Sequence, residues 1–348
     1  MSLPRLQRTV YLLGPERVEL RKVPVPEPRP GEILVKVAAA TTCGTDVKVF
    51  RRGGHPRMLK VPTPFGHELA GTVAAAGAGD ERFPIGERVV VANSAPCGDC
   101  AYCLEGRENL CTDLQYLNGA FSEYLLVPER FARRSTHRIP PGLKFEGAAL
   151  TEPLACVLHA LEQSDLQAGS DVAVYGGGPT GLLFVAVLGA EDHRVTLADP
   201  HPDRLRAGKS LGAEETLSIA RGGGQAEKVR ESARRKMGFD AAIDCTGTPE
   251  GWADAIDSVR PGGRAILFGG CSPGTTVPLD TSRVHYSEIT VQGTYHHRPA
   301  TFARALDLLA RGVFDTRVFL SAERPLEELE EALRSMMRKE ALKVVVRP

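Results

Sequence analysis

Four cysteines lie in one short stretch of this chain, and they constrain its folding more than any other feature. Two residues separate Cys97 from Cys100 and Cys100 from Cys103, and seven separate Cys103 from Cys111. This spacing lets four thiolates converge on one point, and four sulfur ligands in a tetrahedron are typical of a closed, structural Zn²⁺ site. The surrounding loop is rich in glycine and charge, so a metal would replace a missing apolar core. Disulfides are disfavoured, because three cysteines at this spacing cannot all reach good disulfide geometry.

Composition excludes several classes of function. The chain has 348 residues, enough for two domains, and its formal net charge is zero because Lys plus Arg and Asp plus Glu both number 43. A nucleic-acid partner would require a basic face, so none is expected, and neither is an electrostatic membrane anchor. No apolar run approaches the ~18 residues of a membrane span, and the first residues lack a secretion signal's apolar stretch. Eight cysteines, five of them assigned to metal below, favour the reducing cytoplasm.

The hydrophobic pattern predicts an α/β protein. Up to about residue 150, β-rich runs such as 32–37 and 88–91 lie between Gly and Pro residues, which indicates an all-β domain. From about residue 155, strand-like and helical stretches alternate, as in a doubly wound parallel sheet. The expected strands of this sheet are 171–175, 194–198, 241–244, 264–268 and 288–293, with helices at 181–188, 202–211 and 250–259.

The C-terminal part of the sequence is expected to return to the first domain. It has helical patterns near 301–311 and 326–338 and a strand-like run at 343–346. The predicted division is therefore 1–154, 155–290 and 291–348.

A glycine motif opens the second domain. Gly176, Gly178 and Gly181 fit G-x-G-x-x-G, directly after a strand-like run and at the start of a helical one. In that context the first glycine allows a tight turn, the second lets backbone approach a pyrophosphate, and the third lets helix and strand pack closely. The N-terminus of the helix that follows offers free N–H groups and a positive dipole end to phosphates, and Pro179 and Thr180 of the motif are further candidates for contact with the cofactor. The motif therefore predicts a dinucleotide site.

The residues after this motif bear on the choice of dinucleotide. Asp199 stands eighteen residues after Gly181, at the end of the next expected strand. Its carboxylate can accept hydrogen bonds from the adenosine ribose and would repel a 2′-phosphate, which favours NAD over NADP. Arg204 leaves an alternative open, because it can turn toward a 2′-phosphate, stack on adenine or lie in solvent. Thr246, after the strand 241–244, is a further candidate for contact with the cofactor.

A second group of possible metal ligands is dispersed along the chain. Cys43 lies in a turn-like Thr-Cys-Gly-Thr-Asp sequence, His67 and Glu68 follow 24 residues later, and Glu152 is far downstream. Cys, His and one carboxylate leave a position open for water or substrate, as in catalytic rather than structural zinc sites. Alone, Cys43 would be interpreted as a small buried hydrophobe and His67 as a packed histidine. Their occurrence beside a structural-zinc loop and a dinucleotide motif favours the metal site.

Together, Cys43-Gly-Thr-Asp, Gly66-His-Glu, the four-cysteine loop and the glycine motif resemble the zinc-dependent medium-chain dehydrogenase/reductase family over essentially the full length. Within it the chain is most similar to sorbitol (L-iditol) and other polyol dehydrogenases, with L-threonine 3-dehydrogenases as neighbours. The resemblance implies a GroES-like β-barrel catalytic domain, a Rossmann domain and an active site in the cleft between them. It places Cys43, His67 and Glu68 on a catalytic zinc, with Glu152 as an additional ligand, direct or through water. The expected assembly is a homotetramer, with a homodimer as the alternative.

The resemblance also implies a proton relay, and the chain departs from it. Thr45 matches the hydroxyl that relays the substrate proton. Lys48, five residues after Cys43, stands where many family members carry a histidine at the outer end of the relay. Proton exit through zinc-bound water and a carboxylate, Glu68 or Glu152, is then favoured. His159 and the pair at 296–297 are interpreted as packing or surface residues.

These observations predict an enzyme with two zinc ions per chain and NAD, which oxidises a secondary alcohol of a polyol or sugar derivative to the ketone. A carboxylate in place of a thiolate leaves the metal more electrophilic, which suits a vicinal diol. L-threonine 3-dehydrogenase, or another secondary-alcohol dehydrogenase, is the alternative. A non-catalytic protein that binds NAD and zinc is disfavoured, because the catalytic ligand set is complete. The individual substrate does not follow from the sequence.

Overall fold

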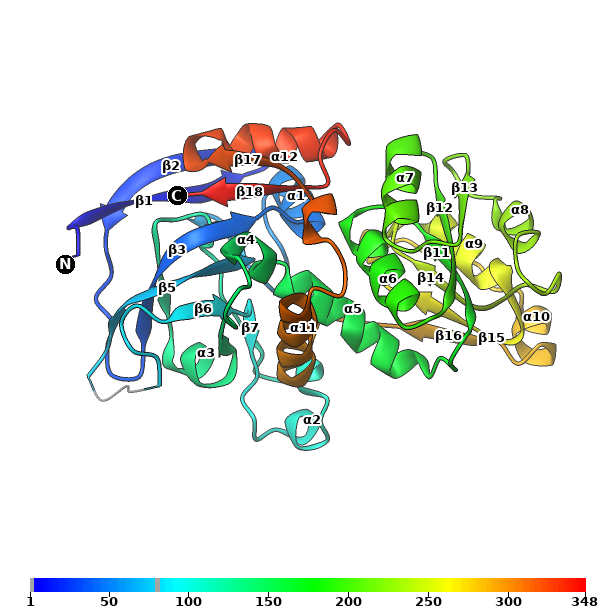
Figure 1. Ribbon diagram of the computed structural model, residues 1–348, viewed down its shortest axis with the longest axis horizontal. Coiled ribbons are helices and arrows are strands. Elements are labelled where there is room, and N and C mark those ends of the chain that lie inside the picture. The colour runs from blue at the N-terminus through cyan, green and yellow to red at the C-terminus, as the bar shows by residue number, and fades with distance from the viewer. Residues whose placement is uncertain (1–2, 79–81) are drawn as a thin grey trace. The chain divides into compact units, whose positions relative to one another are not determined.

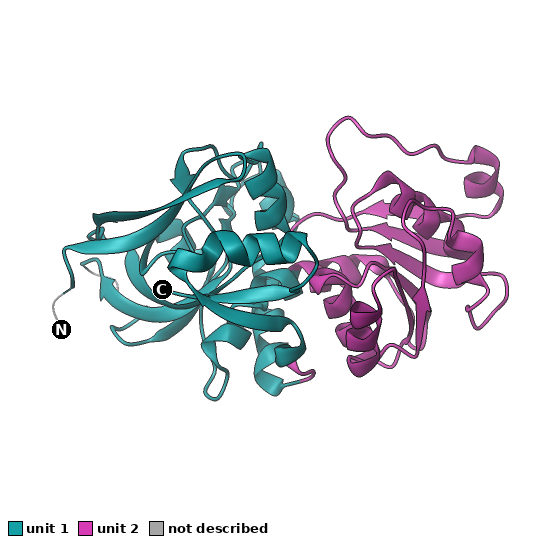
Figure 2. Ribbon diagram, turned by 90° about the horizontal axis from the view of Figure 1, so that it is seen from above, with its two compact units in different colours: residues 1–155, 297–312, 316–348 teal, residues 156–296, 313–315 magenta. Residues whose placement is uncertain are grey.

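The computed structural model describes residues 3–78 and 82–348. The chain forms two compact units, shown in teal and magenta in Figure 2. Unit 1 comprises Met1–Ala155, His297–Gly312 and Thr316–Pro348, and unit 2 comprises Cys156–His296 and Val313–Asp315. Helix α5 (Thr151–Ser164) contains the first boundary between the units. Within the described ranges, no helix has the length and apolar character needed to cross a membrane.

The described residues of unit 1 form three β-sheets, the smallest of which pairs β7 (Ser94–Ala95) with β8 (Gln115–Tyr116). A three-stranded sheet has the order β2-β1-β4, from Arg17–Pro24, Leu6–Gly14 and Thr63–Pro64. The larger sheet has the order β10-β6-β5-β3-β18-β17, with β9 paired to β3 (Figure 1). Its strands are Thr136–Arg138, Arg88–Val91, Leu69–Ala76, Ile33–Thr41, Lys343–Arg347, Leu320–Pro325 and, for β9, Tyr124–Val127. Aromatic and branched residues, among them Val35, Phe50, Phe65 and Phe121, form the buried core.

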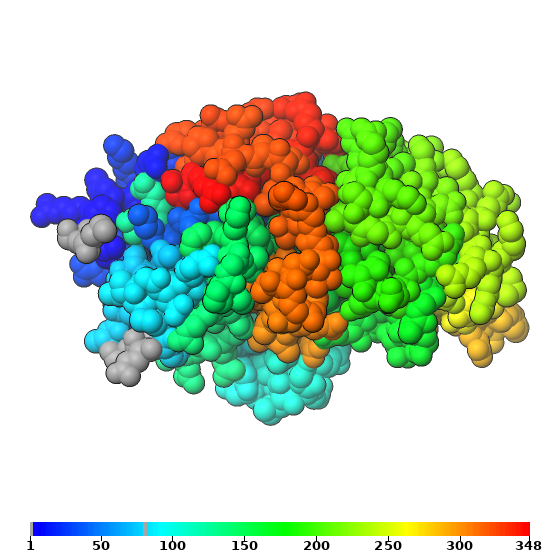
Figure 3. Space-filling model, in the orientation of Figure 1, coloured from blue at the N-terminus to red at the C-terminus, as the bar shows by residue number. Residues whose placement is uncertain are grey.

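The C-terminal segment contributes to this larger sheet. Strand β18 pairs antiparallel with β3, so that Val345 lies opposite Thr41, and β17 pairs parallel with β18. Helix α12 (Leu329–Met337), preceded by the short η3 (Leu326–Glu328), places Leu329 and Leu333 in the core. The space-filling view shows these red C-terminal residues beside the blue N-terminal ones (Figure 3). Because β18 lies next to β3, residues at the two ends of the chain become neighbours.

Unit 1 also contains helices, so the prediction of an all-β first domain was wrong in this respect. Helix α1 (Gly44–Arg52) begins where a turn was expected, because Cys43 and Asp46 form a capping box. Its apolar face buries Val49 and Phe50. The remaining helical elements of this unit are α2 (Ala101–Leu104), η1 (Glu108–Leu110), α3 (Glu129–Arg134), α4 (Phe145–Ala148), α11 (Pro299–Arg311) and η2 (Thr316–Val318).

Unit 2 is a parallel six-stranded sheet with the order β13-β12-β11-β14-β15-β16. The chain starts at the centre with β11, moves outward to β13, and returns to β14 on the other side, which is the doubly wound arrangement. The strands are, in chain order, Asp171–Tyr175, Arg194–Asp199, Glu215–Ser218, Phe239–Asp244, Val259–Leu267 and Thr290–Gly293. All five residues of β11 are buried, which accounts for its continuous apolar pattern.

The helices of unit 2 connect these strands. They are α6 (Pro179–Ala190), α7 (Pro202–Ser210), α8 (Ala226–Arg230), α9 (Pro249–Ser258) and α10 (Thr281–Tyr286). Helix α6 contacts α7, and α8 contacts α9. Tyr175, Phe239 and Val259 are part of the core between sheet and helices. The carboxyl ends of β11 and β14 adjoin where the strand order reverses, and ligands of open α/β sheets bind at this place.

Candidate functional site

The glycine motif forms a tight turn between β11 and α6 in unit 2. Gly176 has φ +96°, a left-handed conformation that favours glycine. A Cβ at Gly181 would lie 1.8 Å from the carbonyl oxygen of Gly176, so only glycine fits there. Gly178 is the N-cap of α6, with Pro179 in its first turn. The turn therefore places the N-terminus of a twelve-residue helix at the carboxyl edge of the sheet.

Asp199 and Arg204 both hold this turn. The Asp199 carboxylate accepts a hydrogen bond from the Gly177 N–H (2.6 Å) and another from the His201 N–H (2.7 Å). The Arg204 guanidinium donates to the Gly177 carbonyl oxygen at 3.0 Å. Burial lowers the pKa of Arg204, and the Asp199 charge opposes this shift. Arg204 is thus folded against the turn instead of extending into solvent from α7.

Thr246 lies on the other side of the turn. Its hydroxyl donates to Asp244 at 2.6 Å, and a Cβ at Gly176 would lie 3.1 Å from its methyl carbon. The fold thus gathers the glycine motif, Asp199, Arg204 and Thr246 around the carboxyl ends of β11, β12 and β14.

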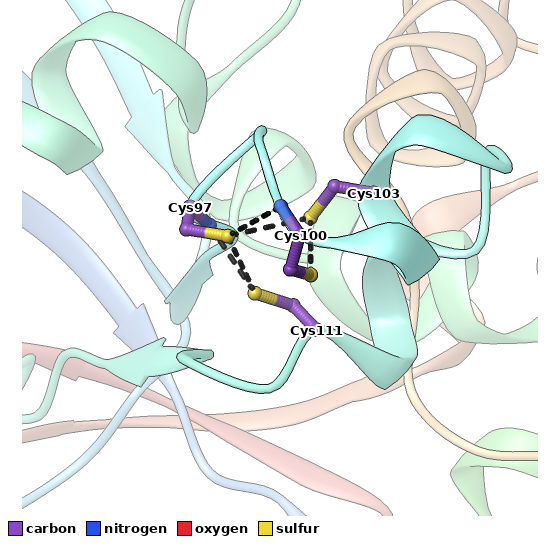
Figure 4. A group of neighbouring side chains, drawn as sticks. All are labelled: Cys97, Cys100, Cys103 and Cys111. Atoms are coloured by element: carbon purple, nitrogen blue, oxygen red, sulfur yellow. Dashed lines mark hydrogen bonds between the residues drawn. The ribbon is translucent and has the colours of Figure 1, made fainter.

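The four cysteine side chains of the loop in unit 1 point toward one another (Figure 4). The sulfur of Cys97 lies 3.8 Å from that of Cys103 and 3.4 Å from that of Cys111, and the sulfurs of Cys100 and Cys103 are 3.5 Å apart. All four are free thiols. Four sulfurs at about 2.3 Å from a zinc ion would be separated by roughly 3.8 Å, so the cluster has the size of a tetrahedral Cys₄ site.

Backbone groups and charge also fit a metal in this loop. The N–H groups of Cys97, Gly98 and Cys100 donate to sulfur atoms at 3.3–3.4 Å. Hydrogen bonds from backbone N–H groups lower the pKa of Cys100 to about 6, whereas burial raises the pKa of Cys103 to about 12. Without a cation the loop therefore stabilises one thiolate and disfavours another. A Zn²⁺ ion would hold all four as thiolates.

The second predicted ligand group also comes together, within unit 1. Ligand atoms of Cys43, His67 and Glu68 all lie within 4.8 Å of one another. His67 is 4% exposed and Glu68 is 0% exposed. Cys43 is the N-cap of α1, and Glu68 immediately precedes β5. A thiol, an imidazole and a carboxylate on three sides of one buried point match the donor types of a zinc site with an open position.

Asp46 orients two members of this group. Its carboxylate accepts from the backbone N–H of Cys43 at 2.9 Å, and it lies 2.9 Å from Nδ1 of His67. Burial alone would lower the pKa of His67, but the Asp46 carboxylate raises it well above its ordinary value. An imidazole held at Nδ1 by a carboxylate presents Nε2 to a metal, an arrangement common at zinc sites. The sequence analysis did not single out Asp46, although the Cys-x-x-Asp spacing is that of a capping box.

Glu68 has a buried partner from the far end of the chain. The ammonium group of Lys343 lies 2.6 Å from Oε2 and 2.9 Å from Oε1 of Glu68, and both side chains are at most 1% exposed. The Thr41 hydroxyl also donates to Oε2. Lys343 is placed there because β18 begins beside the end of β3, where Val344 N–H donates to the Thr42 hydroxyl at 2.8 Å. No local sequence signal connects Lys343 with Glu68.

Glu152 is held by a different partner. It lies in the first turn of α5, is 7% exposed, and accepts a hydrogen bond from the side-chain amide of Asn93 at 2.9 Å. Burial raises the pKa of Glu152 to about 7, an effect that the charge of His67 opposes and that of Glu68 reinforces. Among the described residues, the group formed by Cys43, His67 and Glu68 does not include Glu152, whose carboxylate lies instead within 4.8 Å of a ring nitrogen of His297.

The remaining residues of the predicted relay differ in exposure. Thr45 is partly buried in the first turn of α1, whereas Lys48 is exposed on the same helix. His159 and His297 are 1% and 3% exposed, in agreement with packing rather than surface positions. His297 nevertheless makes a polar contact, because its Nε2 lies 3.0 Å from Oδ1 of Asn93.

Comparison with known families decides what kind of protein this is. The family model described as the alcohol dehydrogenase GroES-like domain matches residues 29–140, and the zinc-binding dehydrogenase model matches residues 179–311. Sorbitol dehydrogenase of Bacillus subtilis is 32% identical over 356 aligned positions, which cover 100% of this chain and 99% of that protein. The chain belongs to the zinc-dependent medium-chain dehydrogenase/reductase family. It is thus an α/β dehydrogenase with a GroES-like domain and a Rossmann domain, as the sequence predicted.

Other relatives of this dehydrogenase differ in their named substrates. L-threonine 3-dehydrogenase of B. subtilis is 31% identical and covers 94% of each chain. Among solved structures, a zinc-binding dehydrogenase from Sinorhizobium meliloti 1021, bound to NADP, superposes with a TM-score of 0.90 at 30% identity, over 99% of this chain and 100% of that one. The 2R,3R-butanediol dehydrogenase from B. subtilis has a TM-score of 0.86 at 26% identity, over 98% and 99% of the two chains.

Proposed function

We propose that this dehydrogenase oxidises a secondary alcohol of a polyol or sugar derivative to the ketone, with NAD as hydride acceptor. The observation that carries the proposal is the group of Cys43, His67 and Glu68, whose ligand atoms lie within 4.8 Å of one another and of which His67 and Glu68 are buried. Its donor types are those of a catalytic zinc site with an open position. The similarity to sorbitol dehydrogenase over the whole chain supports a polyol-type substrate.

In this proposal Cys43, His67 and Glu68 hold the catalytic metal. Zn²⁺ bound by them would act as a Lewis acid that lowers the pKa of an alcohol hydroxyl. Asp46 keeps the His67 ring in its orientation through the 2.9 Å contact at Nδ1. Thr45, in the first turn of α1, would accept the substrate proton through its hydroxyl. Glu152 would contribute as a further ligand, direct or through water.

The four-cysteine loop, Cys97, Cys100, Cys103 and Cys111, would hold the second, structural zinc.

The cofactor is proposed to bind around the glycine turn of unit 2. Gly176, Gly178, Pro179, Thr180 and Gly181 would bring backbone to the pyrophosphate.

The ribose and the choice of dinucleotide depend on the residues beside that turn. The Asp199 carboxylate keeps lone pairs beyond its two backbone hydrogen bonds, so it can accept from ribose hydroxyls. Its charge would disfavour a 2′-phosphate, and the hydrogen bond from the Arg204 guanidinium to the Gly177 carbonyl holds that side chain against the turn. These contacts support NAD over NADP, with Thr246 on the opposite side of the turn.

The domain division and assembly are part of the same proposal. Residues 1–154 and 291–348 would form the catalytic domain and residues 155–290 the NAD-binding domain. The enzyme would work in the cytoplasm as a homotetramer, where a reducing environment keeps its cysteines available for metal. Sedimentation equilibrium of the zinc-loaded protein would separate this state from the alternative homodimer.

A substrate panel tests the proposed function. We expect NAD-dependent turnover with polyols such as sorbitol, and less with L-threonine and primary alcohols. Cys43→Ser and His67→Ala should abolish turnover while NAD binding to unit 2 persists, and Glu152→Gln should reduce turnover less. Cys271→Ser is the matched control, because this cysteine lies in unit 2. Normal turnover by the His67→Ala variant would refute the assignment.

L-threonine is the second candidate substrate, because an L-threonine 3-dehydrogenase is nearly as similar to this chain as the sorbitol dehydrogenase. The same panel decides between them. A kcat/KM for L-threonine above that of every polyol would replace the polyol proposal.

A further inference from the structure

Three buried polar side chains of unit 1 form a chain that ends on Glu152. Nε2 of His297 lies 3.0 Å from Oδ1 of Asn93, and Nδ2 of Asn93 donates to Oε1 of Glu152 at 2.9 Å. Asn93, Glu152 and His297 are 2%, 7% and 3% exposed. At this depth water competes little for the hydrogen-bonding groups, so the protein itself determines their orientation.

The chemistry of the three groups fixes the direction of this chain. An ionised carboxylate only accepts hydrogen bonds, so Asn93 must turn its NH₂ group toward Glu152. The carbonyl oxygen of Asn93 then faces His297, and Nε2 of His297 must carry the proton. If this N–H were missing, the Asn93 amide could turn over and present its oxygen to the Glu152 carboxylate, where the two acceptors would repel.

Both supporting residues are anchored at other points. The backbone carbonyl oxygen of Asn93 accepts a hydrogen bond from the backbone N–H of Leu117 at 2.8 Å. This bond fixes the backbone between β6 and β7 (Ser94–Ala95). The His297 ring packs against Phe302 of α11, with centroids 5.4 Å apart. The start of α11 is in turn fixed by the Thr301 hydroxyl, which accepts from the Arg298 N–H at 2.9 Å. His297 thus has little freedom to follow Asn93 if the amide rotates.

We propose that His297 is a positioning residue, which holds the Asn93 amide in the orientation that fixes the Glu152 carboxylate for the catalytic zinc. The inference rests on the proposed function for the role of Glu152. Partners that orient metal-site carboxylates affect metal affinity or activity by about 10- to 100-fold when they are removed. In this proposal His297 and Asn93 act on the metal through Glu152.

The decisive variants distinguish the effect of losing the His297 N–H donor from the effect of losing the packing of its ring. His297→Phe keeps an aromatic ring against Phe302 but removes the donor. His297→Gln places an amide N–H near the position of Nε2 and should act as the conservative replacement. Asn93→Leu removes the middle of the chain at nearly constant volume. Thermal unfolding of the metal-free variants shows whether each substitution is merely a packing defect.

The main measurement is the rate at which zinc is lost from the loaded enzyme to an excess of chelator, with the four-cysteine site as the internal reference. We expect His297→Phe and Asn93→Leu each to accelerate loss of the catalytic zinc by about 10- to 100-fold. The double variant should be no faster than either single one, because both interrupt the same chain. His297→Gln should stay close to the wild type. Wild-type rates in His297→Phe, or additive effects in the double variant, would overturn the inference.

A second measurement needs neither metal nor turnover. Nitrogen-15 spectra of the histidine-labelled, metal-free protein, recorded at a pH well above the pKa of about 7 of Glu152 so that its carboxyl is ionised, should show His297 as the Nε2–H tautomer. The signal is assigned as the one that His297→Phe removes. An Nδ1–H tautomer would overturn the proposal. A wild-type enzyme that loads only one zinc would refute the proposed catalytic site, and this inference with it. Two zinc ions with no response to His297→Phe would refute the inference alone.

Discussion

Replacing Lys343 by Met should destabilise unit 1 strongly, because it leaves the Glu68 carboxylate buried without its cation. Methionine keeps a linear side chain of similar length, so packing changes little. The ammonium group lies 2.6 Å from Oε2 of Glu68, and the two side chains are 1% and 0% exposed. Removing one partner of such a buried pair costs about 3–5 kcal/mol. If the carboxyl group is instead protonated at pH 7, far above the ordinary carboxyl pKa near 4.3, the protonation costs about 3.7 kcal/mol. Both routes therefore predict a loss of stability of similar magnitude.

The pH dependence follows from the sign of the lysine shift. Burial alone would lower the pKa of Lys343, but the Glu68 carboxylate raises it above the ordinary value of 10.5. A group with a raised folded-state pKa contributes its full stability below the unfolded-state pKa and loses it as the pH rises through the folded-state pKa. The wild-type pair is therefore intact at pH 7–8 and weakens only in alkaline solution. The difference in stability between the wild type and Lys343→Met should therefore be constant at pH 7–8 and shrink as the pH rises through the folded-state pKa of Lys343.

Hydrogen exchange in the metal-free protein is the suitable assay. Protection of the β3 and β18 amides reports on unit 1, whereas the fluorescence of Trp252, the only tryptophan, reports on unit 2 and should not change. Replacing both partners, in Lys343→Met with Glu68→Gln, should recover much of the loss, because no buried charge remains. Arg206→Met, which breaks an exposed pair with Asp203, is the surface control and should have little effect. A single variant within about 1 kcal/mol of wild type, or a double variant no better than the single one, would refute this reasoning.

Four further substitutions test the other sites. Cys103→Ser should lower the zinc content from two ions per chain to one and reduce thermal stability more than hydride transfer, which metal analysis and calorimetry can check. Asp199→Ala should weaken NAD binding by about tenfold or more, the effect of one lost hydrogen bond to a charged group, and raise the NADP-to-NAD ratio of kcat/KM. An unchanged ratio would show that Asp199 does not select the cofactor. Gly181→Ala should disrupt the turn, since the added carbon would meet the Gly176 carbonyl at 1.8 Å, whereas Gly178→Ala, with its nearest contact at 3.5 Å, should fold normally and lose dinucleotide affinity in calorimetric titration.

The elements that the sequence predicted well are those whose residues are buried on a regular pattern. The apolar runs at 171–175 and 194–198 became β11 and β12 because both faces of a parallel sheet are covered. Strand β13 was missed, since Glu215–Ser218 is a short, polar edge strand without a buried run. Helix α1 was missed because its N-cap is a cysteine, which is not among the usual capping residues.

The candidate ligands were predictable from residue type and spacing, but their supports were not. Lys343 is 275 positions from Glu68, and His297 is 204 positions from Asn93. Such contacts arise from strand order and from the point where the C-terminal segment rejoins unit 1. Hydrophobic periodicity predicts which residues are buried, and it carries no information about which polar partners meet there.

The buried charges of unit 1 fit the metal site proposed for its perturbed groups. The carboxylates of Asp46, Glu68 and Glu152 are all at most 7% exposed, and Lys343 neutralises one of them. Buried charges must be paired, so in the metal-free chain protons on His67 and Glu152 offset part of the remaining negative charge. The pKa of His67 is raised well above its ordinary value, and that of Glu152 is raised to about 7. A divalent cation at Cys43, His67 and Glu68 would supply the missing positive charge and displace protons from its ligands. The excess of buried negative charge that destabilises the metal-free fold therefore favours zinc binding.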